Sequence, residues 1–211
     1  MPIFDTLHLE GVNIYIWKLD ESIDELVVAC HDRGIEPDSS AMACKSTSRK
    51  REKLAEQLLL REIFHAPVKL EHDANGAPLI NIHGISISIS HTAGWLCMAF
   101  TNSHRYMGID IEAFNKRVLN VRQKFLNDYE LAWIPSEDIT ANMLAWTAKE
   151  AIYKANLTPG TSLAGGINLD RFAISSDMPI RYKGHVIALN RTFSVASECR
   201  DNFILSLAIL E

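Results

Sequence analysis

Residues 108–112 read Gly-Ile-Asp-Ile-Glu, and residues 146–154 read Trp-Thr-Ala-Lys-Glu-Ala-Ile-Tyr-Lys. The first stretch alternates apolar and acidic residues, which predicts a β-strand with Asp110 and Glu112 on one face. The second is typical of a helix, on which the glutamate and the last lysine lie four residues apart and share a face. Two neighbouring carboxylates repel each other unless a cation lies between them. Together the stretches predict a site for a magnesium ion and the phosphates that it carries.

The composition is that of an ordinary globular protein. Of its 211 residues, 47% are hydrophobic and 22% charged, so the chain is long enough to bury a sizeable core. A net charge of -5 and a pI near 5.9 argue against a nucleic-acid-binding protein, which usually has a basic domain. The N-terminal residues lack the pattern of a signal peptide, and no apolar run reaches the length of a membrane span. Four scattered cysteines are typical of reduced thiols, so we expect a cytoplasmic protein.

The remaining sequence predicts helices and strands in mixed order. Helices are expected at 23–33, 49–64, 118–126 and 139–157, and strands at 12–17, 85–90, 95–101, 106–111, 172–175, 185–190, 192–197 and 203–209. Asn75-Gly76 predicts a tight hairpin turn. The strands are expected to pair largely antiparallel, which favours an α+β fold. The turn at 102–105 is the predicted junction between an N-terminal half, residues 1–103, and a C-terminal half, residues 104–211.

Four motifs carry a resemblance to a known family. Ile-Ser-Ile-Ser-His-Thr lies at 87–92 and Lys-Phe-Leu-Asn-Asp-Tyr-Glu at 124–130, in order with the two stretches quoted above. Each motif is short enough to arise by chance, whereas the four in this order are specific. In them the chain resembles the 4'-phosphopantetheinyl transferases, in particular the longer, surfactin-synthetase-activating type. The motifs cover about residues 45–157.

The resemblance implies both a fold and a reaction. The fold is two similar α+β halves related by a pseudo-twofold axis, with the active site in the cleft between them. The reaction transfers 4'-phosphopantetheine from coenzyme A to a serine of an acyl or peptidyl carrier protein and releases adenosine 3',5'-bisphosphate. Breaking a pyrophosphate needs a divalent cation, here Mg²⁺, and a base for the incoming hydroxyl. We expect a monomer, because the two halves form the cleft within one chain.

The resemblance also implies roles for individual residues. The magnesium ligands are Asp110, Glu112 and Glu150, and Glu150 is also the general base. Contacts with coenzyme A fall on Arg51, Ser90, His91, Asp110 and Lys154, of which Ser90 and His91 touch the 3'-phosphate and Lys154 serves in catalysis. Trp146 is expected to pack under its helix. One departure is Ala77, where the family usually has a basic residue that reaches coenzyme A; Lys45 or Lys69 are conceivable substitutes.

A basic segment follows the acidic strand and is a candidate docking site for the carrier protein. It contains Lys116, Arg117, Arg122 and Lys124, interleaved with apolar residues. Carrier domains of this kind present acidic helices, so an acidic enzyme needs a local positive patch to dock them. The alternative is a solvated amphipathic helix that needs no partner.

Plainer interpretations stand beside each of these assignments. Asp110 and Glu112 are also what the exposed face of an edge strand would carry. Glu150 and Lys154 would also form an ordinary surface pair, and His91 an ordinary turn histidine. Two other functions remain open: a metal-dependent nucleotide phosphoesterase, and a non-catalytic module that binds coenzyme A or a carrier protein.

Overall fold

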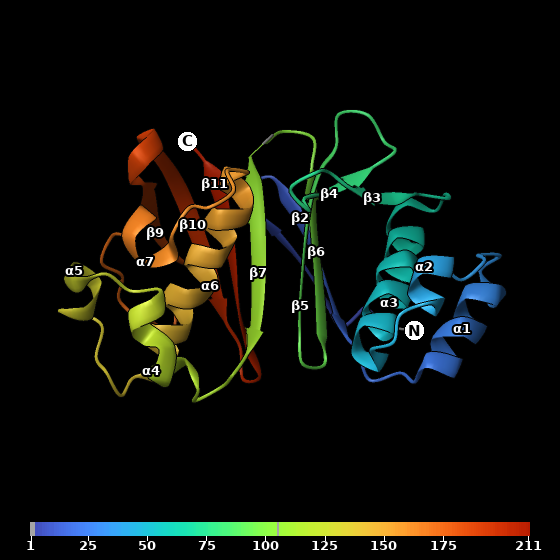
Figure 1. Cartoon of the computed structure of the whole chain (residues 1–211), viewed down its shortest axis with the longest axis horizontal. Helices are drawn as coiled ribbons and strands as arrows, with labels where there is room; N and C mark the ends of the chain where they lie inside the picture. Colours follow the sequence, from blue (N-terminus) through green and yellow to red (C-terminus); the bar gives the residue numbers. More distant parts are fainter. Residues whose placement is uncertain (1–2, 105) are drawn as a thin grey trace.

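Two larger antiparallel sheets, each accompanied by one long helix, dominate the computed structural model, which describes residues 3–104 and 106–211 (Figure 1). The N-terminal half contains β1 (Asp5–Leu9), β2 (Val12–Lys18), α1 (Ile23–Asp32), α2 (Ser39–Met42), α3 (Thr47–Phe64), β3 (Leu70–His72), β4 (Pro78–Ile80), β5 (Ser86–Thr92) and β6 (Trp95–Thr101). The C-terminal half contains β7 (Met107–Ala113), α4 (Val118–Val121), η1 (Arg122–Lys124), α5 (Asp128–Leu131), α6 (Ile139–Asn156), α7 (Leu163–Gly166), β8 (Ile167–Leu169), β9 (Ile180–Val186), η2 (Ile187–Leu189), β10 (Arg191–Cys199) and β11 (Phe203–Leu210).

The two sheets repeat one arrangement of strands. The first has the order β1-β2-β6-β5 and the second β7-β11-β10-β9-β8, while β3 and β4 form a separate hairpin. In each half a strand is followed by the long helix and then by two adjacent strands, the second of which pairs with the strand before the helix. These elements are β2, α3, β5 and β6 in the N-terminal half and β7, α6, β10 and β11 in the C-terminal half. The predicted α+β fold with two similar halves is confirmed. The exact limits of the halves stay a prediction, and Arg105 in the predicted junction lies outside the described residues.

The two long helices start and stop for local reasons. Ser46 caps α3 by accepting a hydrogen bond from the Arg49 N–H, and Asp138 caps α6 in the same way from Ala141. His65 and Leu157, which follow the helices, adopt the left-handed conformation that ends many helices. Each helix runs for 18 residues and buries one side against its sheet. No helix of the described chain is both long and apolar enough to cross a membrane.

Apolar side chains bind the halves to each other. One buried cluster belongs to the C-terminal half and a second to the N-terminal half. A third includes Ile14 and Trp95 of the first sheet together with Ile109, Phe203 and Leu205 of the second. Burial of each such side chain contributes about 1.5–3 kcal/mol, so the contact between the sheets is part of the core.

A glycine sets the distance between α6 and β7. A Cβ atom on Gly108 would lie 2.2 Å from the carbonyl oxygen of Ala151 and 2.6 Å from the backbone nitrogen of Ala155. Only glycine therefore allows the helix to approach the strand this closely. The close approach brings the last turns of α6, with Lys154, over the edge of β7.

Several elements differ from the sequence predictions. Residues 172–175 are not a strand, because Phe172 anchors a loop against the rings of Trp133 and Tyr182. The predicted strand at 185–190 is wrong in most of its length, since β9 ends at Val186 and a 3-10 turn follows. The helix predicted at 118–126 is one turn of α-helix followed by a 3-10 turn. The short strands β1 and β8 were not expected.

Candidate active site

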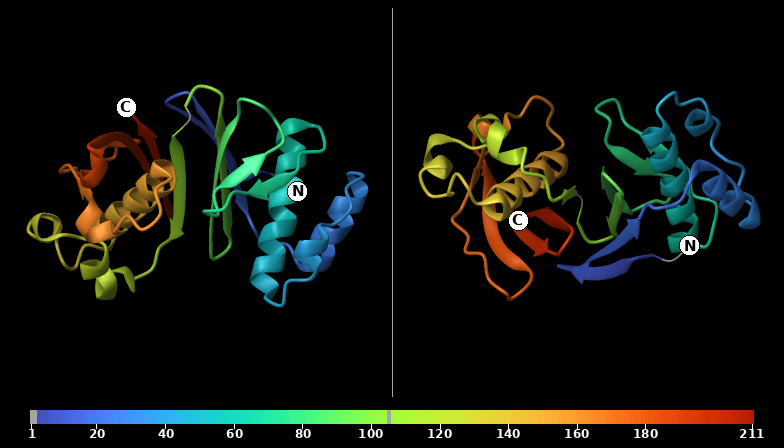
Figure 2. Two further views of the ribbon diagram at one scale, coloured as in Figure 1. Left: turned by 45° about the horizontal axis from the view of Figure 1, so that its top comes forward. Right: turned by 90° about the horizontal axis from the view of Figure 1, so that it is seen from below.

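The site lies where the edge strands β5 and β7 run side by side, and we call this contact the seam (Figure 1). In Figure 1 and in both views of Figure 2, α3 and α6 lie on opposite sides of these two strands. The strands are joined by side chains: the hydroxyls of Ser88, Ser90 and Thr92 accept hydrogen bonds from the N–H groups of residues 109, 111 and 113 at 3.0, 3.3 and 3.5 Å. The alternation Ile-Ser-Ile-Ser-His-Thr explains this, since it points the hydroxyls at β7 and the apolar residues at the N-terminal core.

Asp110 is buried at the centre of the seam, with 5% of its surface exposed. Its Oδ1 accepts hydrogen bonds from Lys154 Nζ and from Ser90 Oγ, both at 2.8 Å. Its Oδ2 is buried and makes no hydrogen bond within the described part of the chain. A buried carboxylate oxygen without a partner is costly unless a ligand satisfies it, so Asp110 is not the solvent-exposed acid of the plainer interpretation.

Glu112 lies two residues further along β7 and is half-buried. Its two oxygens accept hydrogen bonds from Thr92 Oγ1 at 2.9 Å and from Trp146 Nε1 at 3.2 Å. Burial and the charge of Asp110 raise the pKa of Glu112, while the two hydrogen bonds oppose that shift. Trp146 also packs edge-on against Phe125, with ring centroids 5.1 Å apart. Trp146 therefore both packs under α6, as predicted, and orients a carboxylate.

Glu150 is the third acidic side chain and projects from α6. Burial, together with the charges of Asp110 and Glu112, raises its pKa to about 6, although Lys154 acts in the opposite direction. Among the described residues Glu150 has no hydrogen-bond or ion-pair partner. A half-buried carboxylate with a raised pKa and no fixed partner is able to accept a proton or to bind a cation.

Lys154 joins the two halves across the seam. Its Nζ donates to the backbone carbonyl of Ile109 on β7 at 3.0 Å and reaches that of Ile89 on β5 at 3.5 Å. Its ion pair is with Asp110 and not with Glu150, so the two α6 residues do not form the ordinary surface pair considered above. The ammonium is thus held beside Asp110, between the backbones of β5 and β7.

A second polar cluster lies on the other side of β5, against the start of α3. His91 Nε2 lies 2.8 Å from Arg49 Nη1, and His91 Nδ1 lies 3.6 Å from Glu52 Oε2. Arg49 also pairs with Glu52 at 3.2 Å and with Glu56 at 3.5 Å. Burial lowers the pKa of His91, and Glu52 opposes this shift. His91 is therefore more than an isolated turn histidine.

Arg49, and not Arg51, lies against His91. Arg51 donates to the backbone carbonyls of Leu19 at 2.6 Å and Glu21 at 2.8 Å, which ties α3 to the chain before α1. Arg49 and Glu52 were missed as site residues. A signal was present, because residues 49, 52 and 56 recur at helical spacing and share the face of α3 that meets His91.

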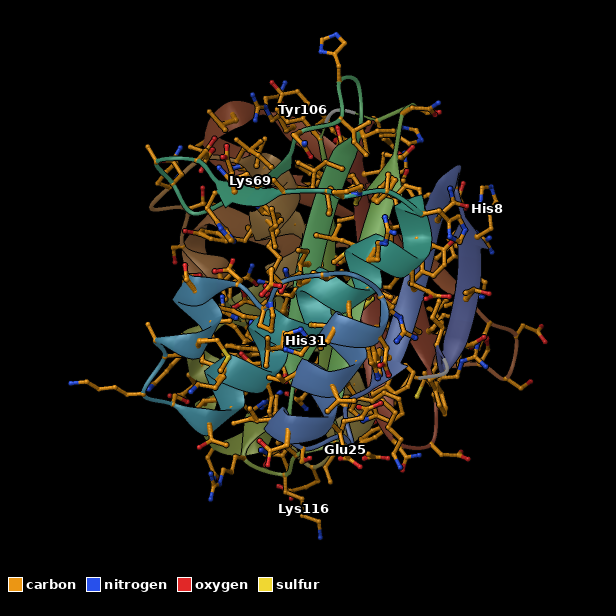
Figure 3. The ribbon with its side chains drawn as sticks, turned by 90° about the vertical axis from the view of Figure 1, so that its right-hand side faces the viewer. His8, Glu25, His31, Lys69, Tyr106 and Lys116 are labelled. Carbon is orange, nitrogen blue, oxygen red and sulfur yellow. The ribbon has the colours of Figure 1, made fainter. Side chains whose placement is uncertain are left out.

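The remaining predicted residues divide into internal and exposed ones. Arg122 donates to Asn142 Oδ1 at 3.1 Å and to the Ile134 carbonyl at 2.6 Å, so its guanidinium has internal partners and is not a free docking group. Lys116, Arg117 and Lys124 are exposed. Lys116 projects from the end of the molecule that carries Glu25, opposite Lys69 and Tyr106 (Figure 3). Of the conceivable substitutes for a basic residue at Ala77, Lys69 pairs with Glu71 at 2.5 Å and Lys45 is exposed.

The acidic residues do not form a closed metal cage. Within residues 3–104 and 106–211, no three histidine, cysteine or acidic side chains are already arranged around one point. Mg²⁺ in phosphate-transfer sites, however, is commonly held by one or two carboxylates plus substrate phosphates. The unpartnered Asp110 Oδ2, with Glu112 and Glu150 nearby in the field of its charge, fits that kind of open site.

A cavity of about 510 Å³ lies away from the seam, in the N-terminal half. It follows α3 and is bounded by the chain before α2 and by the β3–β4 hairpin, with Glu56, Gln57 and Arg61 in its wall. Glu56 links this cavity to Arg49 and so to the His91 cluster. The cavity itself contains none of the seam carboxylates.

Comparison with known proteins finds a family match within the C-terminal half. Residues 106–208 match the family model of the 4'-phosphopantetheinyl transferase superfamily. The matched segment contains Asp110, Glu112, Glu150 and Lys154, whereas Arg51, Ser90 and His91 precede it. No curated protein matches the chain.

Proposed function

Because residues 106–208 place this chain in the 4'-phosphopantetheinyl transferase superfamily, whose members transfer phosphopantetheine to carrier proteins, we propose that it uses coenzyme A as donor and an acyl or peptidyl carrier protein as acceptor. The observation that carries the proposal is that the carboxylates of Asp110, Glu112 and Glu150 lie close enough for their charges to interact, while Lys154 pairs with Asp110. We further propose that the enzyme is a monomer, since each of these groups comes from the same chain, and that it acts in the cytoplasm, since its four cysteines are free thiols.

Mg²⁺ is the cofactor that suits these residues, with Asp110, Glu112 and Glu150 as its protein ligands. Carboxylate oxygens are the ligands that this hard cation prefers. Bound there, the ion would neutralise charge on the pyrophosphate oxygens as the phosphorus–oxygen bond breaks. Asp110 would contribute its unpartnered Oδ2, while its Oδ1 keeps the hydrogen bonds from Ser90 and Lys154.

The transfer step uses Glu150 and Lys154. The serine oxygen of the carrier forms a bond to the phosphorus that carries the pantetheine, and the bond from that phosphorus to the bridging oxygen breaks. Glu150 accepts the serine proton, a role supported by its raised pKa of about 6 and its freedom from other partners in the described chain. The leaving group departs as adenosine 3',5'-bisphosphate. Lys154 supplies a fixed positive charge to the phosphates.

The His91 cluster is proposed to bind the nucleotide end of coenzyme A. His91 and Arg49 are both partly exposed and lie on the α3 side of β5. A guanidinium presents several donors in a fixed plane, which suits phosphate. Ser90 is expected to act less directly, because its hydroxyl is buried and already holds Asp110 and the Ile111 N–H. Lys116, Arg117 and Lys124 are proposed to dock the carrier, without Arg122.

Rates of transfer in three variants test this assignment. Glu150→Gln should lower turnover by about 10²–10⁴-fold, the usual effect of losing a general base. Asp110→Ala should raise the Mg²⁺ concentration needed for half-maximal rate. Glu137→Gln, which changes an exposed acid of the same half, is the matched control and should keep the native rate and Mg²⁺ dependence. Near-native turnover in Glu150→Gln would exclude the proposed mechanism.

A further inference from the structure

The three hydroxyls of the seam make the same backbone contact but differ in a second one. Ser88, Ser90 and Thr92 each accept a hydrogen bond from an N–H group of β7. Ser90 Oγ also donates to Asp110 Oδ1 at 2.8 Å, and Thr92 Oγ1 donates to Glu112 Oε2 at 2.9 Å. Ser88 has no such contact with a carboxylate of the described chain. Only two of the three therefore link β5 to the acidic side chains.

The geometry of these donors limits how the carboxylates can turn. A hydroxyl has one proton, and each of these two protons is directed at one carboxylate oxygen. Because Ser90 holds Oδ1 of Asp110, the unpartnered Oδ2 is fixed in place. Glu112 is held between Thr92 and Trp146 through its two oxygens. Left free, two acidic groups on one strand face would turn away from each other to reduce their repulsion.

We propose that Ser90 and Thr92 are positioning residues, which hold Asp110 and Glu112 in the orientation that receives the cation, whereas Ser88 only joins the strands. The inference rests on the proposed function, since it concerns the same cation site. Hydrogen-bond partners behind metal ligands typically contribute 10–100-fold to metal affinity or activity. Each of the two hydroxyls bonds both to the β7 backbone and to a β7 carboxylate. The position of β5, in the N-terminal half, therefore sets the orientation of Asp110 and Glu112 in the C-terminal half.

The test measures cation binding apart from catalysis. Mn²⁺ serves as the probe, and its affinity is measured by electron paramagnetic resonance with coenzyme A present and carrier protein absent. We expect Ser90→Ala and Thr92→Val each to weaken Mn²⁺ binding by about 10-fold or more. Ser88→Ala is the matched control and should change binding less than twofold. Thr92→Ser keeps the hydroxyl and should restore the affinity lost in Thr92→Val.

Two further readouts separate positioning from a general loss of structure. Melting temperature should fall in both Ser88→Ala and Ser90→Ala, because each loses one backbone contact at the seam, and somewhat further in Ser90→Ala, which also loses the hydrogen bond to Asp110. The KM for carrier protein should stay native in Ser90→Ala and Thr92→Val, while the Mg²⁺ requirement of the reaction rises. If Ser90→Ala does not fold, Ser90→Cys replaces it, since a thiol fills nearly the same space but is a weak donor.

Three outcomes would overturn the inference. Equal weakening of Mn²⁺ binding in Ser88→Ala and Ser90→Ala would show that the seam acts only structurally. Suppose that the unsubstituted protein binds Mn²⁺ and transfers phosphopantetheine. Native Mn²⁺ affinity in both Ser90→Ala and Thr92→Val would then exclude the positioning role and leave the proposed function intact. An unsubstituted protein that neither binds Mn²⁺ nor catalyses transfer would refute both together.

Discussion

The buried ion pair between Glu130 and Lys149 allows a sharp test of what holds α6 in place. Neither side chain is exposed to solvent. Lys149 Nζ donates to Glu130 Oε2 at 2.5 Å and to two backbone carbonyls of segment 163–167 at 2.9 and 2.7 Å. Glu130 accepts further hydrogen bonds from the N–H groups of Asn127 and Leu169. One pair thus connects α5, α6 and the α7–β8 segment, directly beside Glu150.

The perturbation is Lys149→Met, which keeps the length of the side chain and removes its charge. It leaves a buried carboxylate without its counter-charge, a change that typically costs about 3–5 kcal/mol. For a chain of this size each kcal/mol lowers the melting temperature by about 2–4 °C, so we expect a fall of roughly 6–20 °C. Combining Lys149→Met with Glu130→Gln should cost less than the sum of the single changes, because no unpaired charge then remains.

Urea denaturation followed by tryptophan fluorescence measures these free energies of unfolding. Lys183→Met is the matched control, because Lys183 pairs with Glu211 at 2.9 Å on the exposed surface of the same half. A pair of that kind contributes little to stability, so this variant should unfold as the native protein does. A loss below about 1 kcal/mol in Lys149→Met, or simple additivity in the double variant, would show that the buried pair does not hold α6 in place.

Three further predictions concern pH, the nucleotide and the carrier. Burial raises the pKa of Glu56 to about 7 despite Arg49, and the unfolded carboxyl titrates near 4.5, so native stability should fall as the pH rises between these values. Urea denaturation should therefore show that the free energy of unfolding of Glu56→Gln, relative to that of the native protein, rises by about 2–3 kcal/mol between pH 4 and pH 8. A difference that does not change with pH would contradict the raised pKa of Glu56. His91→Ala should raise the KM for coenzyme A more than that for 3'-dephospho-coenzyme A; equal increases would exclude contact with the 3'-phosphate. Lys116→Glu combined with Arg117→Glu should raise the KM for carrier, most steeply at low salt, while the KM for coenzyme A stays constant; a joint change would place docking elsewhere.

The long elements could be predicted from the sequence because their patterns are local. Helix α6 was expected at 139–157 and spans Ile139–Asn156, since its cap and periodicity lie within one segment. The hairpin of β1 and β2 was missed because its turn is Glu10-Gly11, which has two positive φ angles without the usual Asn-Gly signature. Strand β9 was misplaced because the turn after Val186 continues an apolar pattern.

The acidic residues of the candidate site could be proposed from the sequence, but most of the groups that contact them could not. Asp110, Glu112 and Glu150 were expected to meet because their spacing and the family motifs coincide, and they do lie within each other's field. The helical spacing of residues 49, 52 and 56 groups them on one face of α3, but the sequence does not show that this face meets His91, because that is a tertiary contact. The pairing of Ser90 with Asp110 joins residues on two sheets, so no local pattern specifies it.

The mass of the acceptor after reaction decides whether this protein transfers phosphopantetheine. An apo form of an acyl or peptidyl carrier domain is incubated with this protein, coenzyme A and Mg²⁺, and its intact mass is then measured. We expect the carrier to gain the mass of one phosphopantetheine, and Glu150→Gln to abolish the gain within the same time. Cleavage of coenzyme A with no gain would indicate a phosphoesterase instead, and binding of coenzyme A with neither cleavage nor gain would indicate a non-catalytic module; either result would contradict the account.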